Sequence, residues 1–347
     1  MQNLFGLTAE EMQGVLAELK LPKYRAKQIA EWLYQKGAKS FAEMTNLSLD
    51  LRQQLQAKFS LQRPALERRL DSKDGRTSKF LLQFADGVAV ETVLMRQPYG
   101  NSICVSTQAG CNMGCIFCAS TLHGMVRNLT KGEILAQALY IEEMLREEGQ
   151  HVNTMVIMGS GEPLMNYENV LGFIRLCHEK YCLNMGYRNI TLSTSGIVPR
   201  IYDLAEEGIP ITLSISLHAP EEELRSQLMP INRKYHLEEL IAAGGFYAEK
   251  TGRRVTYEYI LIAEMNDGAK QSAELCRLLK GQLANVNLIP INPVEERGLR
   301  RPAEERIAAF ADYLNSHHVT ATVRKEMGQD INAACGQLRN RHLAQQG

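Results

Sequence analysis

The chain has no net charge and no long apolar run. Among its 347 residues, 39 Lys and Arg balance 39 Asp and Glu, so bulk electrostatics alone gives no support to nucleic-acid binding. No apolar stretch is long enough to cross a bilayer, and we expect no membrane partner. Residues 1–5 lack the basic start and apolar core of a signal peptide. We therefore expect a cytoplasmic protein, whose eight cysteines stay reduced and are free for metal binding or catalysis.

Three of these cysteines stand close together in the run Cys-Asn-Met-Gly-Cys-Ile-Phe-Cys. Cys111, Cys115 and Cys118 have CxxxCxxC spacing, with an aromatic residue just before the last of them. Iron–sulfur clusters are normally held by four cysteines, so three thiolates on one loop can hold a [4Fe–4S] cluster and leave one iron open. An open iron can bind a small molecule and pass it an electron. The triplet therefore predicts a catalytic cluster.

The same triplet has two simpler interpretations. Structural zinc closes with four ligands, and His123 could complete a Cys3His site. Alternatively, all three cysteines are ordinary buried thiols, although the tight clustering of so scarce a residue argues against this. We favour the open cluster and keep a zinc-stabilised, non-catalytic module as the alternative.

Periodicity divides the chain into three parts. Apolar residues at helical spacing predict a helical domain in residues 1–62, whose first helix begins at a capping box formed by Thr8 and Glu11. Two strand-like runs flank Asp86-Gly87, a favoured turn pair, and predict a β-hairpin within a connector spanning 63–100. From 101 to 347, strands alternate with amphipathic stretches such as 131–146 and 222–240, which implies a parallel sheet. The expected strands are 79–84 and 88–95 in the hairpin, then 103–107, 154–159, 190–195, 211–217, 255–262, 286–291 and 320–324.

The predicted fold class is α/β, a partial (β/α)6 barrel with a small N-terminal helical domain and a β-hairpin extension. Chemistry in such barrels lies at the C-terminal ends of the strands. Each polar strand end is unremarkable alone, and a lone histidine is more often a core residue than a ligand. The candidate residues at these ends are Gly161 and Glu162 after the second barrel strand, Ser193 at the third, Ser216, Leu217 and His218 at the fourth, and Asn292 after the sixth.

The cysteine triplet and these strand ends together resemble the radical S-adenosylmethionine (SAM) superfamily. In that superfamily, SAM binds the fourth iron, and an electron from the cluster cleaves it to methionine and a 5′-deoxyadenosyl radical. The resemblance implies a [4Fe–4S] cluster on Cys111, Cys115 and Cys118, and SAM as the second cofactor. The implied SAM-binding residues are Gly161 and Glu162 for the amino group, and Ser193, Ser216, Leu217, His218 and Asn292 for the rest of the molecule.

Over essentially the whole chain, the sequence is similar to the adenosine-methylating radical SAM enzymes of ribosomal RNA. The matching segments include residues 90–93 in the hairpin and 330–338 near the C-terminus. This resemblance implies three catalytic residues: Cys335 as a methylated intermediate, Cys104 as the thiol that releases the product, and Glu91 as a base. Three further cysteines match no motif and are expected to be structural, namely Cys177, Cys182 and Cys276.

The mechanism that the resemblance implies consumes two SAM molecules per turnover. The first methylates Cys335, and the second supplies the radical that removes hydrogen from that methyl group. The resulting carbon radical adds to the adenine ring and tethers RNA to protein. After the ring proton is removed, Cys104 attacks the Cys335 sulfur, which releases methylated RNA and leaves a disulfide bond.

The family has two branches, which methylate adenine at C2 or at C8. The Gly-Glu-Pro-Leu run favours the C2 branch, whose substrates are 23S ribosomal RNA and, in some members, transfer RNA. The alternative is the C8 branch, which confers antibiotic resistance. A low-potential electron donor such as flavodoxin or ferredoxin is implied in either case. A radical SAM enzyme that acts on a small molecule is a further alternative.

Overall fold

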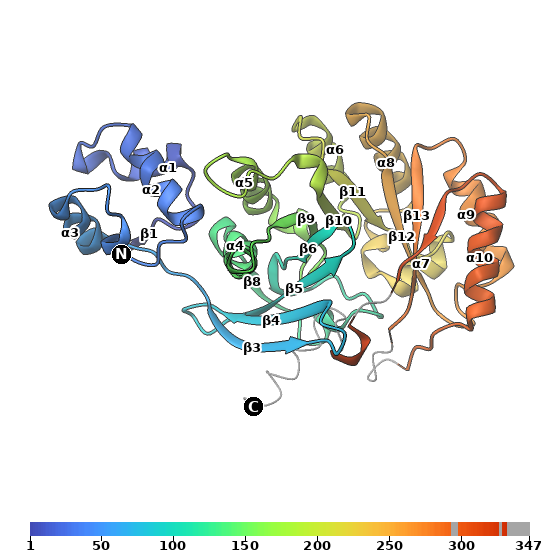
Figure 1. Cartoon of the computed structure of the whole chain (residues 1–347). Helices are drawn as coiled ribbons and strands as arrows, with labels where there is room; N and C mark the ends of the chain where they lie inside the picture. Colours follow the sequence, from blue (N-terminus) through green and yellow to red (C-terminus); the bar gives the residue numbers. More distant parts are fainter. Residues whose placement is uncertain (293–297, 326–327, 332–347) are drawn as a thin grey trace.

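A ten-stranded sheet runs through most of the molecule (Figure 1). The computed structural model describes residues 1–292, 298–325 and 328–331. The barrel part of the sheet is parallel throughout, and each of its strands overlaps one predicted from the sequence. These strands are β6 (Gly100–Cys104), β9 (Val152–Ile157), β10 (Ile190–Thr194), β11 (Thr212–Ser216), β12 (Val255–Leu261), β13 (Ala284–Pro290) and β14 (Ala321–Val323). The α/β barrel prediction is confirmed.

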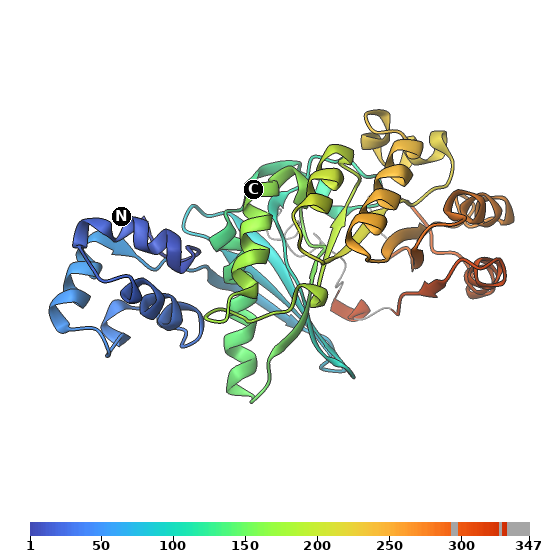
Figure 2. The same ribbon diagram turned by 90° about the horizontal axis from the view of Figure 1, so that it is seen from above.

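Helices connect the parallel strands, and those from the first half of the barrel lie side by side along its outer face (Figure 2). The first begins at Thr130, whose side chain accepts the N–H of Glu133 while the Glu133 carboxylate accepts the N–H of Thr130. Such a capping box satisfies two backbone donors that the helix itself leaves unpaired. The helices are α4 (Lys131–Glu147), α5 (Tyr167–His178), α6 (Val198–Glu206), α7 (Glu222–Leu228), α8 (Leu237–Thr251), α9 (Ala269–Leu279) and α10 (Glu304–Ser316). No helix within the described residues is long and apolar enough to span a membrane.

The single amphipathic stretch expected at 222–240 is wrong, because the chain breaks in its middle. The helix α7 ends at Leu228, a short 3-10 helix η6 (Pro230–Arg233) follows, and α8 begins at Leu237. Pro230 has no N–H to continue the helix, and it forces the preceding Met229 out of the helical region, to φ −136° and ψ 98°. The break turns the short α7 toward the ends of the strands.

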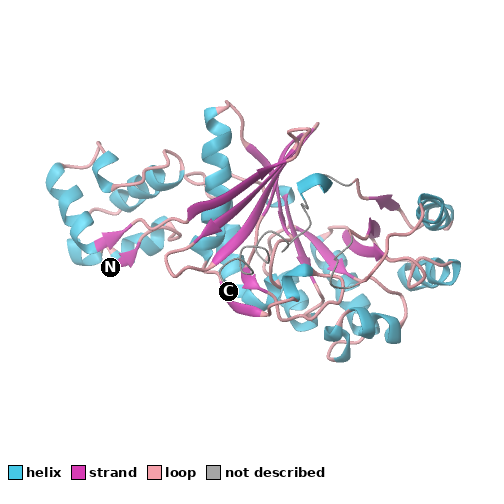
Figure 3. Ribbon diagram, turned by 90° about the horizontal axis from the view of Figure 1, so that it is seen from below, coloured by secondary structure: helices cyan, strands magenta, loops and turns pink. Residues whose placement is uncertain are grey.

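The predicted hairpin is present and belongs to the same sheet as the barrel (Figure 3). Its two strands, β4 (Thr77–Gln83) and β5 (Ala89–Gln97), pair antiparallel, and β5 continues the pairing onto β6. A third strand, β3 (Ala65–Asp71), lies at the sheet edge and was not predicted. Its largely exposed Ala-Leu-Glu-Arg-Arg-Leu-Asp sequence has no clear apolar alternation, so periodicity could not reveal it.

The N-terminal module packs three helices against a short parallel strand pair. Its elements are β1 (Gln2–Asn3), α1 (Ala9–Val15), α2 (Tyr24–Tyr34), α3 (Leu49–Lys58) and β2 (Phe59–Ser60), with β1 paired to β2. The predicted capping box of Thr8 and Glu11 is confirmed. The apolar side chains of the module, including Met12, Ile29 and Leu55, are continuous with the barrel core. The division of the chain at 62/63 and 100/101 stays a prediction.

The module meets the barrel where two glycines touch. Gly6 has φ +95°, and a Cβ added to it would lie 2.3 Å from the Cα of Gly132 at the start of α4. The N–H of Gly6 also donates to the hydroxyl of Tyr34 at 3.0 Å. Backbone therefore packs directly on backbone at this junction, with no room for a side chain.

We predict that Gly6→Ala destabilises the protein by about 2 kcal/mol or more, because strain at positive φ and overpacking each cost of order 1–3 kcal/mol. Urea unfolding followed by circular dichroism measures this change. Gly14→Ala is the matched control, since it lies in α1 with nothing within 4 Å of the added Cβ. That variant should be stabilised by up to about 1 kcal/mol. Equal stability of the two variants would contradict the close contact.

Candidate active site

The three cysteines lie on the loop of a small hairpin just after β6. Its strands, β7 (Gln108–Gly110) and β8 (Met125–Asn128), pair antiparallel, and the loop between them includes the 3-10 helix η3 (Ala119–Thr121). The Thr121 hydroxyl donates to the carbonyls of Cys115 and Cys118, at 3.2 and 2.9 Å. Cys111 and Cys115 are buried and Cys118 is half-buried. The loop therefore holds its last two cysteines in one compact turn.

The thiols lie within electrostatic range of one another. Burial raises the pKa of Cys111 to about 12, and the neighbouring Cys118 and Glu162 add to the rise. Burial also raises the pKa of Cys115, with further contributions from Cys118 and Cys111. The buried Cys111 and Cys115 thiols therefore ionise readily only when a metal centre supplies compensating positive charge.

The Cys3His zinc alternative finds no support in this geometry. His123 is exposed, and no three His, Cys, Asp or Glu side chains within the described residues are arranged to hold a metal ion. Zinc needs its ligands to converge at about 2.0–2.3 Å from one point. The thiolates of an iron–sulfur cubane bind different irons and do not need to converge. The cysteine loop therefore fits a cluster better than zinc.

The Gly-Glu loop after β9 lies against the cysteine hairpin. A Cβ on Gly161, whose φ is +105°, would lie 2.5 Å from the Cβ of Gln108, so only glycine fits there. The Glu162 N–H donates to the Gln108 Oε1 at 2.8 Å. The buried Glu162 carboxylate accepts from the Ser195 N–H at 2.6 Å and from the Thr194 hydroxyl at 2.8 Å. The Leu164 N–H is a third donor, at 2.9 Å from Oε1. A carboxylate has about four acceptor positions, so it can accept one more donor, such as an ammonium group.

Burial raises the pKa of Glu162, while hydrogen bonds from Ser195 and Leu164 oppose the rise. The negative charge of Glu162 contributes to the raised pKa of the Cys111 thiol. The two groups therefore repel each other when both are ionised. A cationic ligand between them would relieve both charges. Glu162 thus lies beside the cysteine loop, and its assignment to the SAM amino group stays a prediction.

The next two strand ends lie on the same side of the sheet. Ser193 of β10 pairs with Ser214 of β11, and strand periodicity puts Ser216 on the same face as Ser214. The N–H groups of Leu217 and His218 both donate to the Glu258 carbonyl on β12, at 3.0 and 3.2 Å. These two hydrogen bonds hold the chain against β12 where it leaves β11.

His218 is held in an unusual conformation against the cysteine loop. Its φ is +60°, which is rare outside glycine. Its ring lies edge-on to Phe117, with the centroids 4.6 Å apart. The Ile260 N–H donates to Nδ1 at 3.0 Å, so the proton of the neutral ring sits on Nε2. Burial lowers the pKa of His218 to about 3, and the charge of Arg225 lowers it further. His218 is therefore a neutral hydrogen-bond donor at physiological pH.

Sequence reasoning missed Arg225, which lies fully buried on α7 between the cysteine loop and the strand ends. Its guanidinium donates to the carbonyls of Leu217, Ser195 and Ser216, at 3.2, 2.9 and 3.0 Å. It also donates to the Asn232 Oδ1 at 2.6 Å. In the sequence, this arginine is one charge in an amphipathic helix, a pattern that ordinarily indicates a solvated face.

The predicted base and the predicted releasing thiol share one face of the sheet. Val93 of β5 pairs with Cys104 of β6, and Glu91 lies two residues earlier on β5, so its side chain points the same way. Glu91 forms an ion pair with Lys79 of β4 at 2.9 Å, and both side chains are buried. This face is opposite to the one formed by Phe80, Leu82 and other apolar residues that belong to the main core.

Two further predicted residues lie apart from this network. Asn292 is exposed and follows Ile291, which packs in the same apolar cluster as Cys115. Cys335 lies outside the described residues. The last described element before Cys335 is the 3-10 helix η8 (Gln329–Ile331). It lies beside the turn that joins the end of β3 to the start of β4 (Figure 1). There the Asp330 carboxylate accepts the N–H of Lys73 at 2.8 Å.

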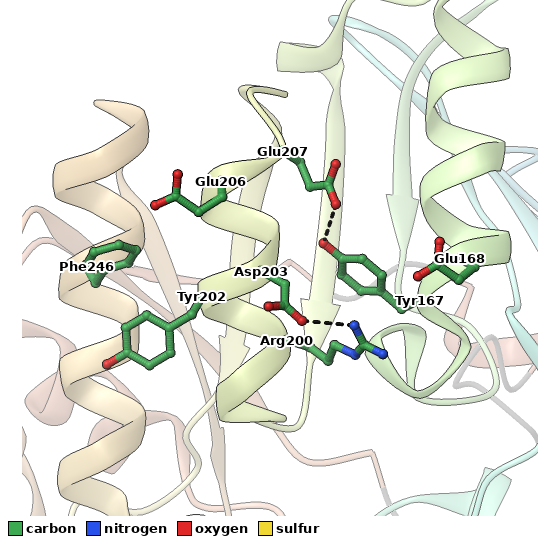
Figure 4. Close-up of a pocket in the computed structure, with 8 residues that line it drawn as sticks. All are labelled: Tyr167, Glu168, Arg200, Tyr202, Asp203, Glu206, Glu207 and Phe246. Carbon is green, nitrogen blue, oxygen red and sulfur yellow. Dashed lines mark hydrogen bonds and ion pairs between the residues drawn. The ribbon is translucent and has the colours of Figure 1, made fainter.

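A separate cavity of about 440 Å³ opens between α5, α6 and α8 on the outer face of the barrel (Figure 4). Its polar groups are largely paired with one another. The Tyr167 hydroxyl donates to Glu207 at 3.0 Å, and Arg200 pairs with Asp203 at 2.9 Å. None of the predicted site residues lines it. The strand ends, not this cavity, bring the predicted residues together.

Family models match two segments of the chain. Residues 105–276 match the Radical SAM superfamily, and residues 2–61 match the Ribosomal RNA large subunit methyltransferase N-terminal domain. A protein of Symbiobacterium thermophilum, named as a probable dual-specificity RNA methyltransferase RlmN, is 56% identical over 343 residues, which cover 98% of this chain and 92% of that protein. A Staphylococcus aureus protein of the same name is 51% identical over 338 residues, with 97% and 93% covered.

A solved structure is similar over the same length. The crystal structure of a radical SAM methyltransferase from Sphaerobacter thermophilus has a TM-score of 0.93 and 45% identity, and it covers 97% of this chain and 99% of that chain. The fold and the three-cysteine loop thus define a radical SAM enzyme, a class that implies a [4Fe–4S] cluster and SAM. By its identity to the full-length relatives, the chain belongs to the RlmN family of dual-specificity RNA methyltransferases. The predicted family and enzyme class are confirmed, and the roles of individual residues stay predictions.

The neutral state of His218 predicts a pH dependence of stability. Its folded pKa of about 3 lies below the ordinary value of 6.5, so the unfolded chain binds a proton between these values that the folded chain does not. Stability therefore falls as the pH falls below 6.5, by about 1.4 kcal/mol per pH unit from this group. Asn tolerates positive φ, and its Oδ1 can replace Nδ1 as the acceptor.

His218→Asn should remove this part of the pH dependence. Urea unfolding of the cluster-free wild type and variant at pH 7, 6, 5 and 4 measures the difference. We expect the two stabilities to converge by about 1.4 kcal/mol for each pH unit below 6.5. Parallel pH profiles for the two proteins would show that the ring is protonated in the folded state.

Proposed function

We propose that this enzyme methylates C2 of an adenosine in 23S ribosomal RNA and in transfer RNA, through a methyl-cysteine intermediate. The observation that carries the proposal is the shared face of Glu91 and Cys104, next to the parallel strand ends where the cysteine loop lies. The full-length relatives bear the name dual-specificity RNA methyltransferase. We extend that RNA specificity to this chain, with residues 2–61 as an RNA-contacting domain.

Three cysteines and seven strand-end residues would hold the two cofactors. When bound, the cluster supplies the electron that cleaves SAM. Glu162 accepts the SAM ammonium group, because its carboxylate is buried beside Cys111 and needs a cationic partner. His218 offers a neutral Nε2–H donor. The remaining SAM contacts are assigned to Gly161, Ser193, Ser216, Leu217 and Asn292.

Cys335 would carry the methyl group between a first SAM and the adenine ring, and a second SAM would serve as the radical source. The described chain reaches Ile331 only four residues earlier, where the Asp330 carboxylate accepts the N–H of Lys73 in the β3–β4 turn. Four residues of extended chain span at most about 14 Å, so Cys335 would have to act within that distance of Ile331. Glu91 takes the ring proton from C2. Cys104 then attacks the Cys335 sulfur, and the electron pair of the bond from that sulfur to the product carbon passes to that carbon, which takes up a proton to complete the methyl group. The unpaired electron of the adduct would return to the oxidised cluster, and a disulfide remains.

Lys79 has a defined task in this scheme. The ion pair with Lys79 holds the Glu91 carboxylate in place and away from water, since Lys79 is fully buried and Glu91 nearly so. An ionised carboxylate is the form that can accept a proton. A flavodoxin or ferredoxin would supply the electrons, both for SAM cleavage and for reduction of the disulfide.

The decisive experiment is nucleoside mass spectrometry of ribosomal and transfer RNA from a null strain complemented with this gene. Wild type should restore 2-methyladenosine in both RNAs. Cys335→Ala and Cys104→Ala should abolish product release, because each removes one sulfur of the methyl relay. Cys276→Ala is the control, since this half-buried cysteine has no assigned role and should leave methylation intact.

Other products would separate the alternatives. The appearance of 8-methyladenosine would move the enzyme to the C8 branch. Unchanged RNA with a purified protein that binds zinc and no iron would indicate the non-catalytic module. Methylation that survives Cys335→Ala would remove the methyl-cysteine step.

The Lys79–Glu91 pair yields a separate prediction about stability. Removing one member of a buried ion pair costs about 3–5 kcal/mol, because the other charge stays buried without its partner. Lys79→Met should therefore be strongly destabilised, and Lys79→Met/Glu91→Gln should recover much of the loss. A double-mutant cycle by urea unfolding gives the coupling energy, and a coupling below about 0.5 kcal/mol would mean that the two sites act independently.

A further inference from the structure

Arg225 is buried on α7 with its positive charge unpaired by any directly bonded acid. Its exposed fraction is 1%. Among the residues that the structure describes, its hydrogen-bond partners are three carbonyl oxygens and one amide oxygen. Burying a cation is costly unless a nearby anion offsets its charge. Within the described part of the chain, the fold therefore buries a cation that no directly bonded acid offsets, and this requires an explanation.

The nearest acidic side chain along the hydrogen-bond chain does not resolve this. Asn232, which accepts from Arg225, donates its own amide to the Glu222 Oε1 at 2.9 Å. Glu222 is exposed and accepts from the Leu237 N–H and pairs with His236. Water and these partners screen its charge, so it offsets little of the charge of Arg225.

The cysteine loop is the other neighbour of α7. The carbonyl of Leu228, at the end of this helix, accepts the N–H of Ile116 at 3.1 Å. Leu228 and Met229 pack in one apolar cluster with Cys115. The helix that carries Arg225 therefore packs directly against the loop of Cys115.

The strand ends are bound by the same guanidinium. Its Nη2 joins the Ser195 carbonyl after β10 to the Ser216 carbonyl of β11, and its Nε holds the Leu217 carbonyl. Ser195 also donates its N–H to the Glu162 carboxylate, so Ser195 links Arg225 to the Gly-Glu loop. A planar fork with five donors can make these contacts at once, whereas a lysine ammonium cannot.

We propose that Arg225 is a positioning residue with two tasks: it fixes the ends of β10 and β11, and it supplies the buried positive charge that raises the reduction potential of the cluster. A cluster held by three thiolates is anionic, and reduction adds a further negative charge. Net charge and burial set the potentials of such clusters. A fixed cation in a water-excluded site therefore favours the reduced state. This inference rests on the proposed cluster site at Cys111, Cys115 and Cys118.

The test compares Arg225→Gln, which removes the charge, with Arg225→Lys, which keeps the charge and loses the fork. Redox titration of the anaerobically reconstituted holoenzymes by electron paramagnetic resonance gives the potential, and equilibrium binding gives the SAM affinity. Arg225→Gln should make reduction at least tenfold less favourable, which is 59 mV for one electron. Arg225→Lys should keep the potential and bind SAM at least tenfold more weakly. Arg233→Gln, an exposed charge on η6, should change neither.

Each outcome decides the inference. Equal potentials in wild type, Arg225→Gln and Arg225→Lys, or an equal fall in both variants, would overturn the charge role. If Arg225→Gln retains no iron, the result for Arg225→Lys decides the charge role. Full iron content and an unchanged potential in Arg225→Lys support it. Loss of the cluster from both variants overturns it. Iron content of the wild type is checked first. A wild type without about four irons would defeat the proposed function itself, a failure distinct from that of Arg225.

Discussion

The active end of the barrel depends on the side chain of Gln108, which ties two loops together. Its Oε1 accepts the Glu162 N–H at 2.8 Å, its Nε2 donates to the Asn128 Oδ1 at 2.7 Å, and its N–H donates to the Ser160 carbonyl at 3.1 Å. The cysteine hairpin and the Gly-Glu loop are thereby one rigid unit. Gly161 permits this contact by presenting no Cβ to Gln108. Preorganised sites of this kind lose little free energy to ordering when a ligand binds.

Much of this arrangement could be predicted from the sequence, because it follows from chain order. Parallel strands put their carboxyl ends on one edge, so the polar residues after β9, β10 and β11 had to converge. Spacing sufficed for the cysteine loop, since its ligands are local. Arg225 could not be predicted in the same way. Its hydrogen bonds depend on the helix break at Pro230 and on backbone carbonyls at the ends of two strands. Every residue has a backbone carbonyl, so the sequence does not show which ones accept a hydrogen bond.

The other misses have similar physical causes. The edge strand β3 has no buried face of its own and so lacks the period-two pattern that marks a strand. The ion pair of Lys79 with Glu91 joins the two strands of the hairpin. The two residues are diagonal neighbours, not direct partners, so the contact can be recognised only when the pairing of the strands is known. The sequence pattern therefore predicted which residues carry chemistry, and the structure added which residues hold those predicted residues in place.

Among the described residues, the outermost strands of the sheet are β14 and β3, and the fold treats these two edges differently. The edge at β14 is only three residues long, which leaves little backbone for another strand to pair with. The edge at β3 is longer, but its pairing with β4 is interrupted by a bulge between Leu66 and Arg68, and charged side chains cover it. Short, bulged and charged edges resist strand addition by other molecules. An enzyme whose RNA-facing surface must stay accessible can therefore accumulate in a crowded cell without joining its sheets into aggregates.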